Sequence, residues 1–167
     1  MKISIIDEDV LYTGQSIELG LSLIQRETIF FSICFKTPFA TISINHEDHS
    51  SFVCILDIDN MADTISEGLK NNSSEIVTGS GEPLFYIEII RHRHSDIINE
   101  SENKNITNTL FLFTMELDTG KIWKDRTTDS SFSMTLSVRK ECIERFVSFL
   151  RDIKQQFMLQ KDVGNWY

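Results

Sequence analysis

Residues 16–24 read SIELGLSLI, and apolar side chains occupy every second position from Ile17 to Leu23. Alternation with a period of two is typical of a strand that buries one face. Other stretches rich in β-branched and aromatic residues lie on either side, separated by polar turns. They predict further strands at residues 3–6, 28–35, 39–45 and 51–56. The first third of the chain is therefore expected to be β-structure.

The hydrophobic period then changes to that of a helix. Met61, Ile65 and Leu69 are four residues apart, and Asp59 or Asn60 ahead of them can cap a helix. The polar stretch at 71–74 should end this helix, which is short and is weakened by a glycine.

The second half of the chain repeats this order. Strands are predicted at 84–90, 110–117, 121–125 and 132–138, with a polar loop at 96–108 and a glycine hairpin turn at 118–120. Ser137 can cap a long helix from about Val138 to about Gln160. Its apolar residues recur at helical spacing: Cys142, Phe146, Phe149, Leu150, Ile153 and Phe157.

Strands followed by a helix, twice over, indicate an α+β fold of two antiparallel sheets, or one strongly curved sheet, with helices at the ends. The 167 residues fit a single domain, 1–167, large enough to bury a core without disulfides or metal. Apolar residues make up 41% and charged residues 25%, which is the composition of a globular protein.

The net charge is −9, with 25 acids against 16 bases. This balance argues against general nucleic-acid binding and against docking to an anionic membrane, since both use Lys and Arg. It favours a cationic partner. The N-terminal stretch becomes acidic too soon for a signal peptide, and no apolar run approaches a membrane span of about 20 residues. A cytoplasmic protein without a membrane anchor is therefore expected.

The acids are concentrated at the start of the chain. Nine acids stand against three bases in residues 1–60, a net of −6. Such a surface could steer and hold a basic protein, although solvated turns explain it equally well. Asp57 and Asp59 also have a simpler role as helix-capping residues. The candidate pool for partner binding is Asp7, Glu8, Asp9, Glu47, Asp48, Asp57 and Asp59.

Candidates for catalysis and metal binding are weak. Arg91-His92-Arg93-His94 could hold an anion or a metal, with His46 and His49 as further ligands, but a strand end entering solvent is the simpler interpretation. Cys34, Cys54 and Cys142 are too far apart in sequence for a metal motif and are expected to be buried, reduced thiols. Ser80 lacks the strand–turn–helix context of a nucleophile. We therefore expect no enzyme and no cofactor.

Aromatic residues offer a nucleic-acid alternative. Phe30, Phe31 and Trp123 could stack on the bases of a single strand. Few basic residues surround them, so a place in the hydrophobic core is the preferred interpretation.

The order of these elements carries a family resemblance. Curved strands, the helix at Met61–Leu69, more strands, the hairpin at 118–120 and the long helix from Ser137 resemble the Whirly-type fold. They also resemble bacterial immunity proteins of contact-dependent growth inhibition and related polymorphic-toxin systems. The segment Phe132-Ser133-Met134-Thr135-Leu136-Ser137 is similar to the way such proteins end.

The resemblance implies a role in neutralising a toxin. Immunity proteins of this kind bind a cognate protein toxin, typically a basic nuclease, and block it without covalent chemistry. Plant Whirly proteins bind single-stranded DNA, which makes a Whirly-like nucleic-acid-binding protein the alternative. The acidity of this chain departs from them and suits the first role.

Overall fold

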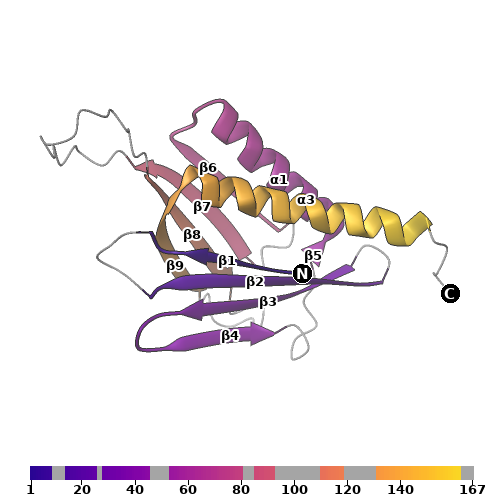
Figure 1. The fold of residues 1–167 in the computed structure, drawn as a ribbon, viewed down its shortest axis with the longest axis horizontal. Coiled ribbons are helices and arrows are strands. Elements are labelled where there is room, and N and C mark those ends of the chain that lie inside the picture. Colours follow the sequence, from indigo (N-terminus) through magenta and orange to yellow (C-terminus); the bar gives the residue numbers. More distant parts are fainter. Residues whose placement is uncertain are drawn as a thin grey trace, which may run out of the picture.

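The computed structural model describes residues 1–8, 14–25, 28–45, 53–80, 85–92, 110–118 and 131–162. It contains two antiparallel sheets, each followed in the chain by a helix (Figure 1). The predicted α+β class, with its two strand-then-helix halves and a long C-terminal helix, is confirmed. The loop predicted at 96–108, residues 119–120 of the hairpin turn and the strand at 121–125 lie outside the described residues.

The first sheet has the strand order β1-β2-β3-β4, with the short strand β5 also pairing with β3. Its strands are β1 (Lys2–Ile6), β2 (Ser16–Gln25), β3 (Thr28–Lys36), β4 (Thr41–Asn45) and β5 (Val53–Cys54). The alternation predicted from residues 16–24 is visible directly, because Ile17, Leu19 and Leu21 are fully buried. The predicted start at residue 39 is two residues early, since 37–40 form the turn.

Helix α1 (Ile55–Lys70) begins earlier than predicted. Ile55 and Leu56 were expected to continue a strand, and Asp59 or Asn60 to cap the helix; both expectations are wrong. Cys54 is the N-cap, and its backbone N–H donates to Asp57 Oδ2 at 3.3 Å. This local bond lies at the start of the helix. The helix therefore begins at Ile55, inside the segment that was predicted to be a strand. The helix ends at residues 71–74, as predicted.

The second sheet has the order β6-β7-β8-β9. Its strands are β6 (Glu75–Gly79), β7 (Phe85–His92), β8 (Leu110–Asp118) and β9 (Ser131–Arg139). The last three agree with the predicted strands to within two residues. Strand β6 was missed, because its five residues are too few to show a clear alternation.

Helix α3 (Lys140–Asp162) follows β9 directly. Ser137 was expected to cap this helix and Val138 to begin it, but both lie in β9, where Ser137 pairs with Leu112 and Val138 with Phe111. The predicted apolar face is confirmed for Cys142, Phe146, Phe149, Leu150 and Ile153, which are all buried. The side chain of Phe157 lies outside the described residues.

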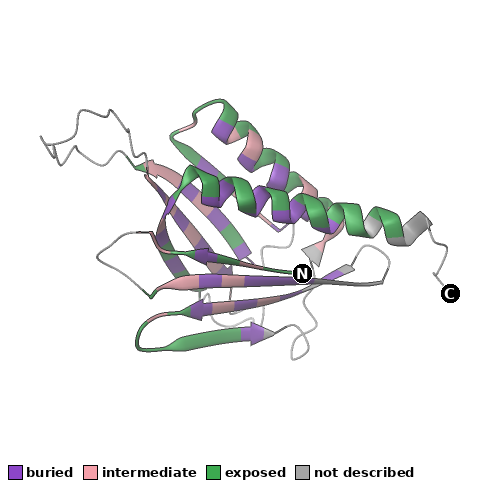
Figure 2. Cartoon of the chain, in the orientation of Figure 1, coloured by how far each residue is buried: buried purple, intermediate pink, exposed green. Residues whose placement is uncertain are grey.

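One hydrophobic cluster contains buried side chains from both sheets and both helices (Figure 2). Edge-to-face aromatic pairs join the layers. Phe31 of β3 meets Phe85 of β7, with ring centroids 5.8 Å apart. Phe113 of β8 meets Phe146 of α3 at 5.4 Å. The preferred interpretation of Phe31 as a core residue is confirmed; the side chain of Phe30 and all of Trp123 lie outside the described residues.

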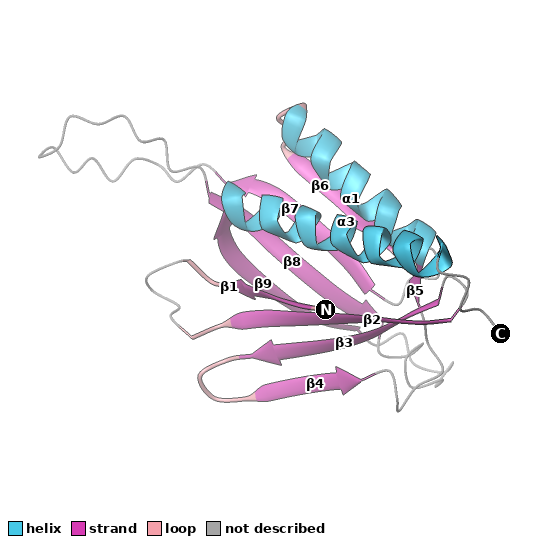
Figure 3. Ribbon diagram, turned by 45° about the vertical axis from the view of Figure 1, so that its right-hand side comes forward, coloured by secondary structure: helices cyan, strands magenta, loops and turns pink. Residues whose placement is uncertain are grey.

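The helices of the two halves, α1 and α3, run side by side and contact each other (Figure 3). Lys154 of α3 pairs with Asp59 of α1, and Arg151 donates to Ser66 Oγ at 3.0 Å. Because position 59 meets 154 and position 66 meets 151, the helices are antiparallel. Both sheets keep one face toward the core and one face outward, because buried residues alternate with more exposed ones along their strands.

Candidate protein-binding surfaces

Asp7 and Glu8 join the end of β1 to β9. Asp7 Oδ1 accepts a hydrogen bond from Ser137 N at 3.1 Å, and Glu8 N donates to Ser137 O at 2.8 Å. Glu8 Oε2 lies 3.0 Å from Arg139 Nε, and 27% of the Glu8 side chain is exposed. These two candidates therefore have structural partners within the chain.

Asp57 and Asp59 lie in the first turns of α1 and also have internal partners. Asp57 accepts the N-cap hydrogen bond from Cys54 N, as the capping interpretation predicted. Asp59 Oδ2 is 2.6 Å from Lys154 Nζ on the neighbouring helix. Asp57 therefore caps α1, and Asp59 links α1 to α3.

The structure does not bring the four described candidates together. Asp7 and Glu8 follow the end of β1, which lies at one side of the molecule, whereas α1 begins beside β5 at the other side (Figures 1 and 3). Asp9, Glu47 and Asp48 lie outside the described residues. The first-half acids described here therefore do not make one continuous face.

A different group of acids does share a face. We call it the acidic face: the outward side of the second sheet, which carries Glu75, Glu88, Glu116 and Asp118. The strand register places Glu88 opposite Val77 and Thr114, and Glu116 opposite Tyr86 and Ser133. All of these positions alternate with core residues, so their side chains point away from the core.

Apolar side chains are mixed with these acids. Val77 is 55% exposed and Tyr86 is 41% exposed, while Ile90 and Leu112 are half-buried. Within the described part of the chain, no ion pair joins Glu75, Glu88 or Glu116 to a base. Exposed aromatic groups are enriched at protein interfaces, and carboxylates beside them are complementary to a basic surface.

The acidic face was not predicted from the sequence, although a signal was present. Thr114, Glu116 and Asp118 stand at alternate positions of a predicted strand, and Tyr86 and Glu88 do so in the preceding one. Period two puts each set on one side of its strand. The pairing of the two strands, which joins the sets, is not visible in the sequence.

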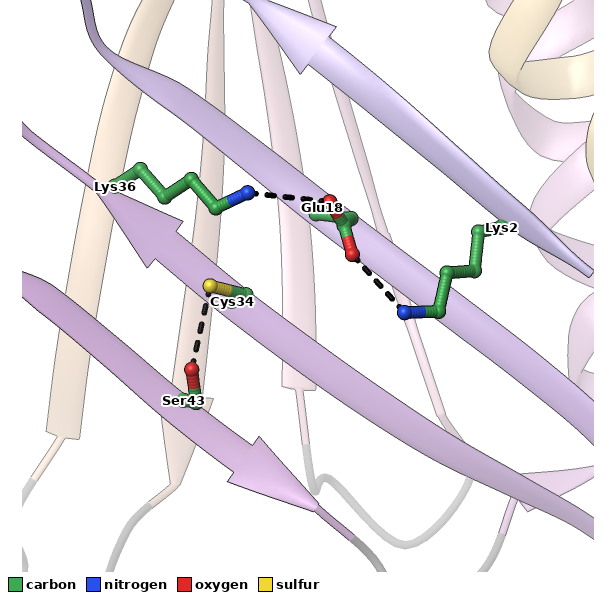
Figure 4. Close-up of polar contacts among 5 residues, drawn as sticks. All are labelled: Lys2, Glu18, Cys34, Lys36 and Ser43. Carbon is green, nitrogen blue, oxygen red and sulfur yellow. Dashed lines mark hydrogen bonds and ion pairs between the residues drawn. The ribbon is translucent and has the colours of Figure 1, made fainter.

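The outward side of the first sheet is polar and carries a cluster of three charged side chains (Figure 4). Glu18 of β2 lies between two lysines: Oε1 is 3.2 Å from Lys2 Nζ, and Oε2 is 3.3 Å from Lys36 Nζ. The hydrogen bond from Lys2, then that from Lys36, lowers the pKa of Glu18 below its ordinary value. The one carboxylate offsets one of the two lysines, so the cluster has a net charge of +1.

The cysteines differ in their burial. Cys142 is buried, as predicted, and burial raises the pKa of its thiol. Cys34 and Cys54 are only half-buried, so the prediction of burial is wrong for them. Cys34 is on the outward side of β3, where Ser43 Oγ is 3.3 Å from its sulfur (Figure 4). All three are free thiols.

Arg91 is anchored at the end of β7. Its Cζ lies 5.6 Å from the ring centroid of Phe111, and its Nη2 donates to Asn72 Oδ1 at 2.9 Å. This half-buried packing differs from the expected emergence into solvent, while His92 is exposed. Arg93, His94, His46 and His49 lie outside the described residues. Ser80 follows β6 in a buried position, where its N–H donates to Phe85 O at 3.2 Å.

No cluster of three or more potential metal ligands occurs among the residues that the structure places. No helix in the described ranges is long and apolar enough to cross a membrane. Comparison with known proteins finds no family model, no curated protein and no solved structure that matches the chain.

Proposed function

We propose that the chain is an immunity protein that binds a cognate protein toxin, a basic nuclease, and neutralises it by non-covalent blocking. The proposal joins the family resemblance of the sequence to one structural observation. That observation is the acidic face, where Glu88 and Glu116 lie beside exposed Val77 and Tyr86.

Charge complementarity supports this partner. A nuclease must attract a polyanion, so the surface around its active site is positive. Carboxylates opposite that surface accelerate encounter and fix orientation. Tyr86 adds a rigid contact that has both apolar area and a hydroxyl group, a residue type enriched at protein interfaces.

The first experiment concerns the partner itself. The C-terminal domain encoded by the gene immediately upstream is purified and mixed with this chain at increasing ratios. We expect a 1:1 complex and loss of nuclease activity at equimolar concentration. A toxin domain that keeps full activity with a molar excess of this chain would refute neutralisation.

The second experiment locates the interface with charge reversals. Glu88→Lys and Glu116→Lys should each slow association about tenfold and flatten its dependence on salt concentration. Asp152→Lys, at an exposed position on α3, changes the net charge equally and is the matched control. Binding is measured by surface kinetics at several salt concentrations. Equal effects of all three substitutions would contradict the acidic face as the contact.

A further inference from the structure

Strand β6 is the outer edge of the second sheet. It pairs with β7 on one side, and the strand order begins with it. It lies at the end of the sheet opposite β9 (Figures 1 and 3). Of the strands in the described ranges, none other than β7 pairs with it.

Hydrogen bonds at both ends of the β6–β7 pair show which backbone groups face each other. Ser80 N donates to Phe85 O at 3.2 Å, and Arg91 N donates to Ser74 O at 2.8 Å. Hydrogen-bonded pairs alternate with non-bonded pairs along an antiparallel ladder. The bonded pairs of these two strands are therefore 74/91, 76/89, 78/87 and 80/85.

The other three residues of β6 turn their backbone groups to the free edge. Glu75, Val77 and Gly79 direct their N–H and C=O groups away from β7, and such a row is a template for a further strand. The same three positions lie on the acidic face, because Ile76 between them is buried in the core. A strand added to this edge would therefore extend the acidic face.

Two of these positions favour a basic side chain in an added strand through their charges. Glu75 is exposed and would pair directly with a lysine or arginine opposite it. Val77 is 55% exposed and lies opposite Glu88 of β7. A basic residue opposite Val77 would lay its aliphatic stem on the valine and bring its charge toward Glu88.

Gly79 favours a cation for a different reason. It lies opposite Tyr86 of β7, and a Cβ added at Gly79 would be 3.1 Å from Tyr86 Cδ1. The tyrosine ring therefore lies against the bare backbone of the glycine, and Tyr86 is 41% exposed. A basic side chain opposite Gly79 would reach the ring with no side chain between them, which allows a cation–π contact.

We propose that the free edge of β6 binds an extended segment of a basic protein as an added antiparallel strand. Lysine or arginine occupies the alternate positions of that segment, opposite Glu75, Val77 and Gly79. The inference rests on the proposed function for the toxin as the protein that carries the segment.

Charge selects this occupant. Residues 71–80 contain one charged residue, Glu75, and the outward positions of the next two strands add Glu88 and Glu116. A basic segment meets only opposite charges there, whereas an acidic segment, such as one from a second copy of this chain, meets like charges.

Two peptides with the same side chains test strand addition without the toxin. The first is the heptapeptide Lys-Val-Lys-Val-Lys-Val-Lys. The second is its analogue with methylated backbone nitrogens at the lysines, which are the donors that face the edge when lysines lie opposite Glu75, Val77 and Gly79. NMR titration of the labelled protein should give a Kd of about 0.1 mM for the first peptide and about tenfold weaker binding for the second.

The amide signals of Val77 and Gly79 should shift most in this titration. Equal affinity for the two peptides would mean attraction by charge alone and would overturn the proposal. No change of these two signals at about 1 mM of the first peptide would overturn it as well. This comparison uses the wild-type chain, so it does not depend on the folding of a variant.

Substitutions then test the edge from the side of the protein. Val77→Pro removes an outward N–H at an edge position where proline is tolerated, and should weaken peptide binding about tenfold relative to Val77→Ala, which keeps that N–H. Ser43→Pro is the matched control. The bonded pairs of β3 and β4 include 37/40 and 35/42, so Ser43 N–H faces the free edge of the other sheet. It should leave peptide binding unchanged.

Thermal unfolding checks that each variant is folded. Equal peptide binding by folded Val77→Pro and Val77→Ala overturns the proposal. The same two variants, measured with the toxin domain, separate it from neutralisation. A toxin that binds both equally tightly overturns strand addition and leaves neutralisation standing. A wild-type chain that binds the peptide at Val77 but not the toxin supports the edge and refutes neutralisation.

Discussion

Glu18 illustrates how an exposed carboxylate can be held by its neighbours. Its two oxygens are bound by lysines on different strands, so the cluster links β1, β2 and β3 on the outward side of the sheet. About 30% of the Glu18 side chain is exposed, and solvent screens both ion pairs. The cluster therefore contributes more to the local charge state than to global stability.

We predict that removing either lysine raises the pKa of Glu18. The pKa is lowered in the folded state, so the stabilisation from Glu18 is present above the unfolded-state pKa and is lost as pH falls through the folded-state value. Titration of the Glu18 carboxyl by NMR in Lys2→Met and Lys36→Met measures this.

Lys140→Met, which removes a lysine paired with Glu144 on α3, is the control and should leave the Glu18 titration unchanged. The shift should also shrink in 1 M salt, where the Debye length is about 3 Å. An unchanged Glu18 titration in both lysine variants would show that the ion pairs do not form in solution.

At the scale of elements, Gly68 determines how closely α1 can approach β6. A Cβ added there would lie 2.5 Å from Cγ1 and 2.6 Å from Cδ1 of Ile76. Ile76 is only 5% exposed, so its side chain has little room to move. The glycine that weakens the helix in isolation is therefore required by packing.

We predict that Gly68→Ala destabilises the protein by about 1–2 kcal/mol, although alanine is the better helix former by about 1 kcal/mol. In an Ile76→Ala background the clash is absent, so Gly68→Ala should then stabilise by about 1 kcal/mol. Urea unfolding of the four proteins in this cycle measures both effects. The same sign in both backgrounds would contradict the packing explanation.

The elements that could be predicted from sequence are those with long periodic patterns. Strands β2, β3, β8 and β9 and helix α3 were found because burial imposes a period of two or 3.6. The start of α1 was not predicted, because Ile55 and Leu56 also fit the pattern of a strand. The capping bond between Cys54 and Asp57 favours the helix instead. The predicted start of α3 was also wrong, because pairing with β8 extends β9 to Arg139.

At the scale of the whole molecule, the sequence predicted that a binding surface would be acidic, but not which residues would form it. The excess of acid is a property of composition, and it led to a basic partner. Which acids have bonds within the chain is a property of the fold: Asp7, Glu8, Asp57 and Asp59 do, whereas Glu88 and Glu116 lie on the outward side of the second sheet and pair with no base among the described residues. Only strand pairing reveals that difference.

We predict no useful affinity for single-stranded DNA at about 0.15 M salt. The net charge is −9, and the two lysines on the outward side of the first sheet are already bound to Glu18. Fluorescence anisotropy with a labelled thymidine oligonucleotide measures this, with a known single-strand-binding protein as the positive control. Submicromolar binding would favour the Whirly-like nucleic-acid-binding alternative instead.

The bond between Asp7 and Ser137 spans 130 positions of the chain, and this has a consequence for biosynthesis. A ribosome adds about 5–20 residues per second, so β9 follows the end of β1 after roughly 6–26 s. During that interval the residues of β9 that bond to the end of β1 do not yet exist. The contact between the two sheets at Asp7 and Ser137 therefore cannot form until β9 has been synthesised.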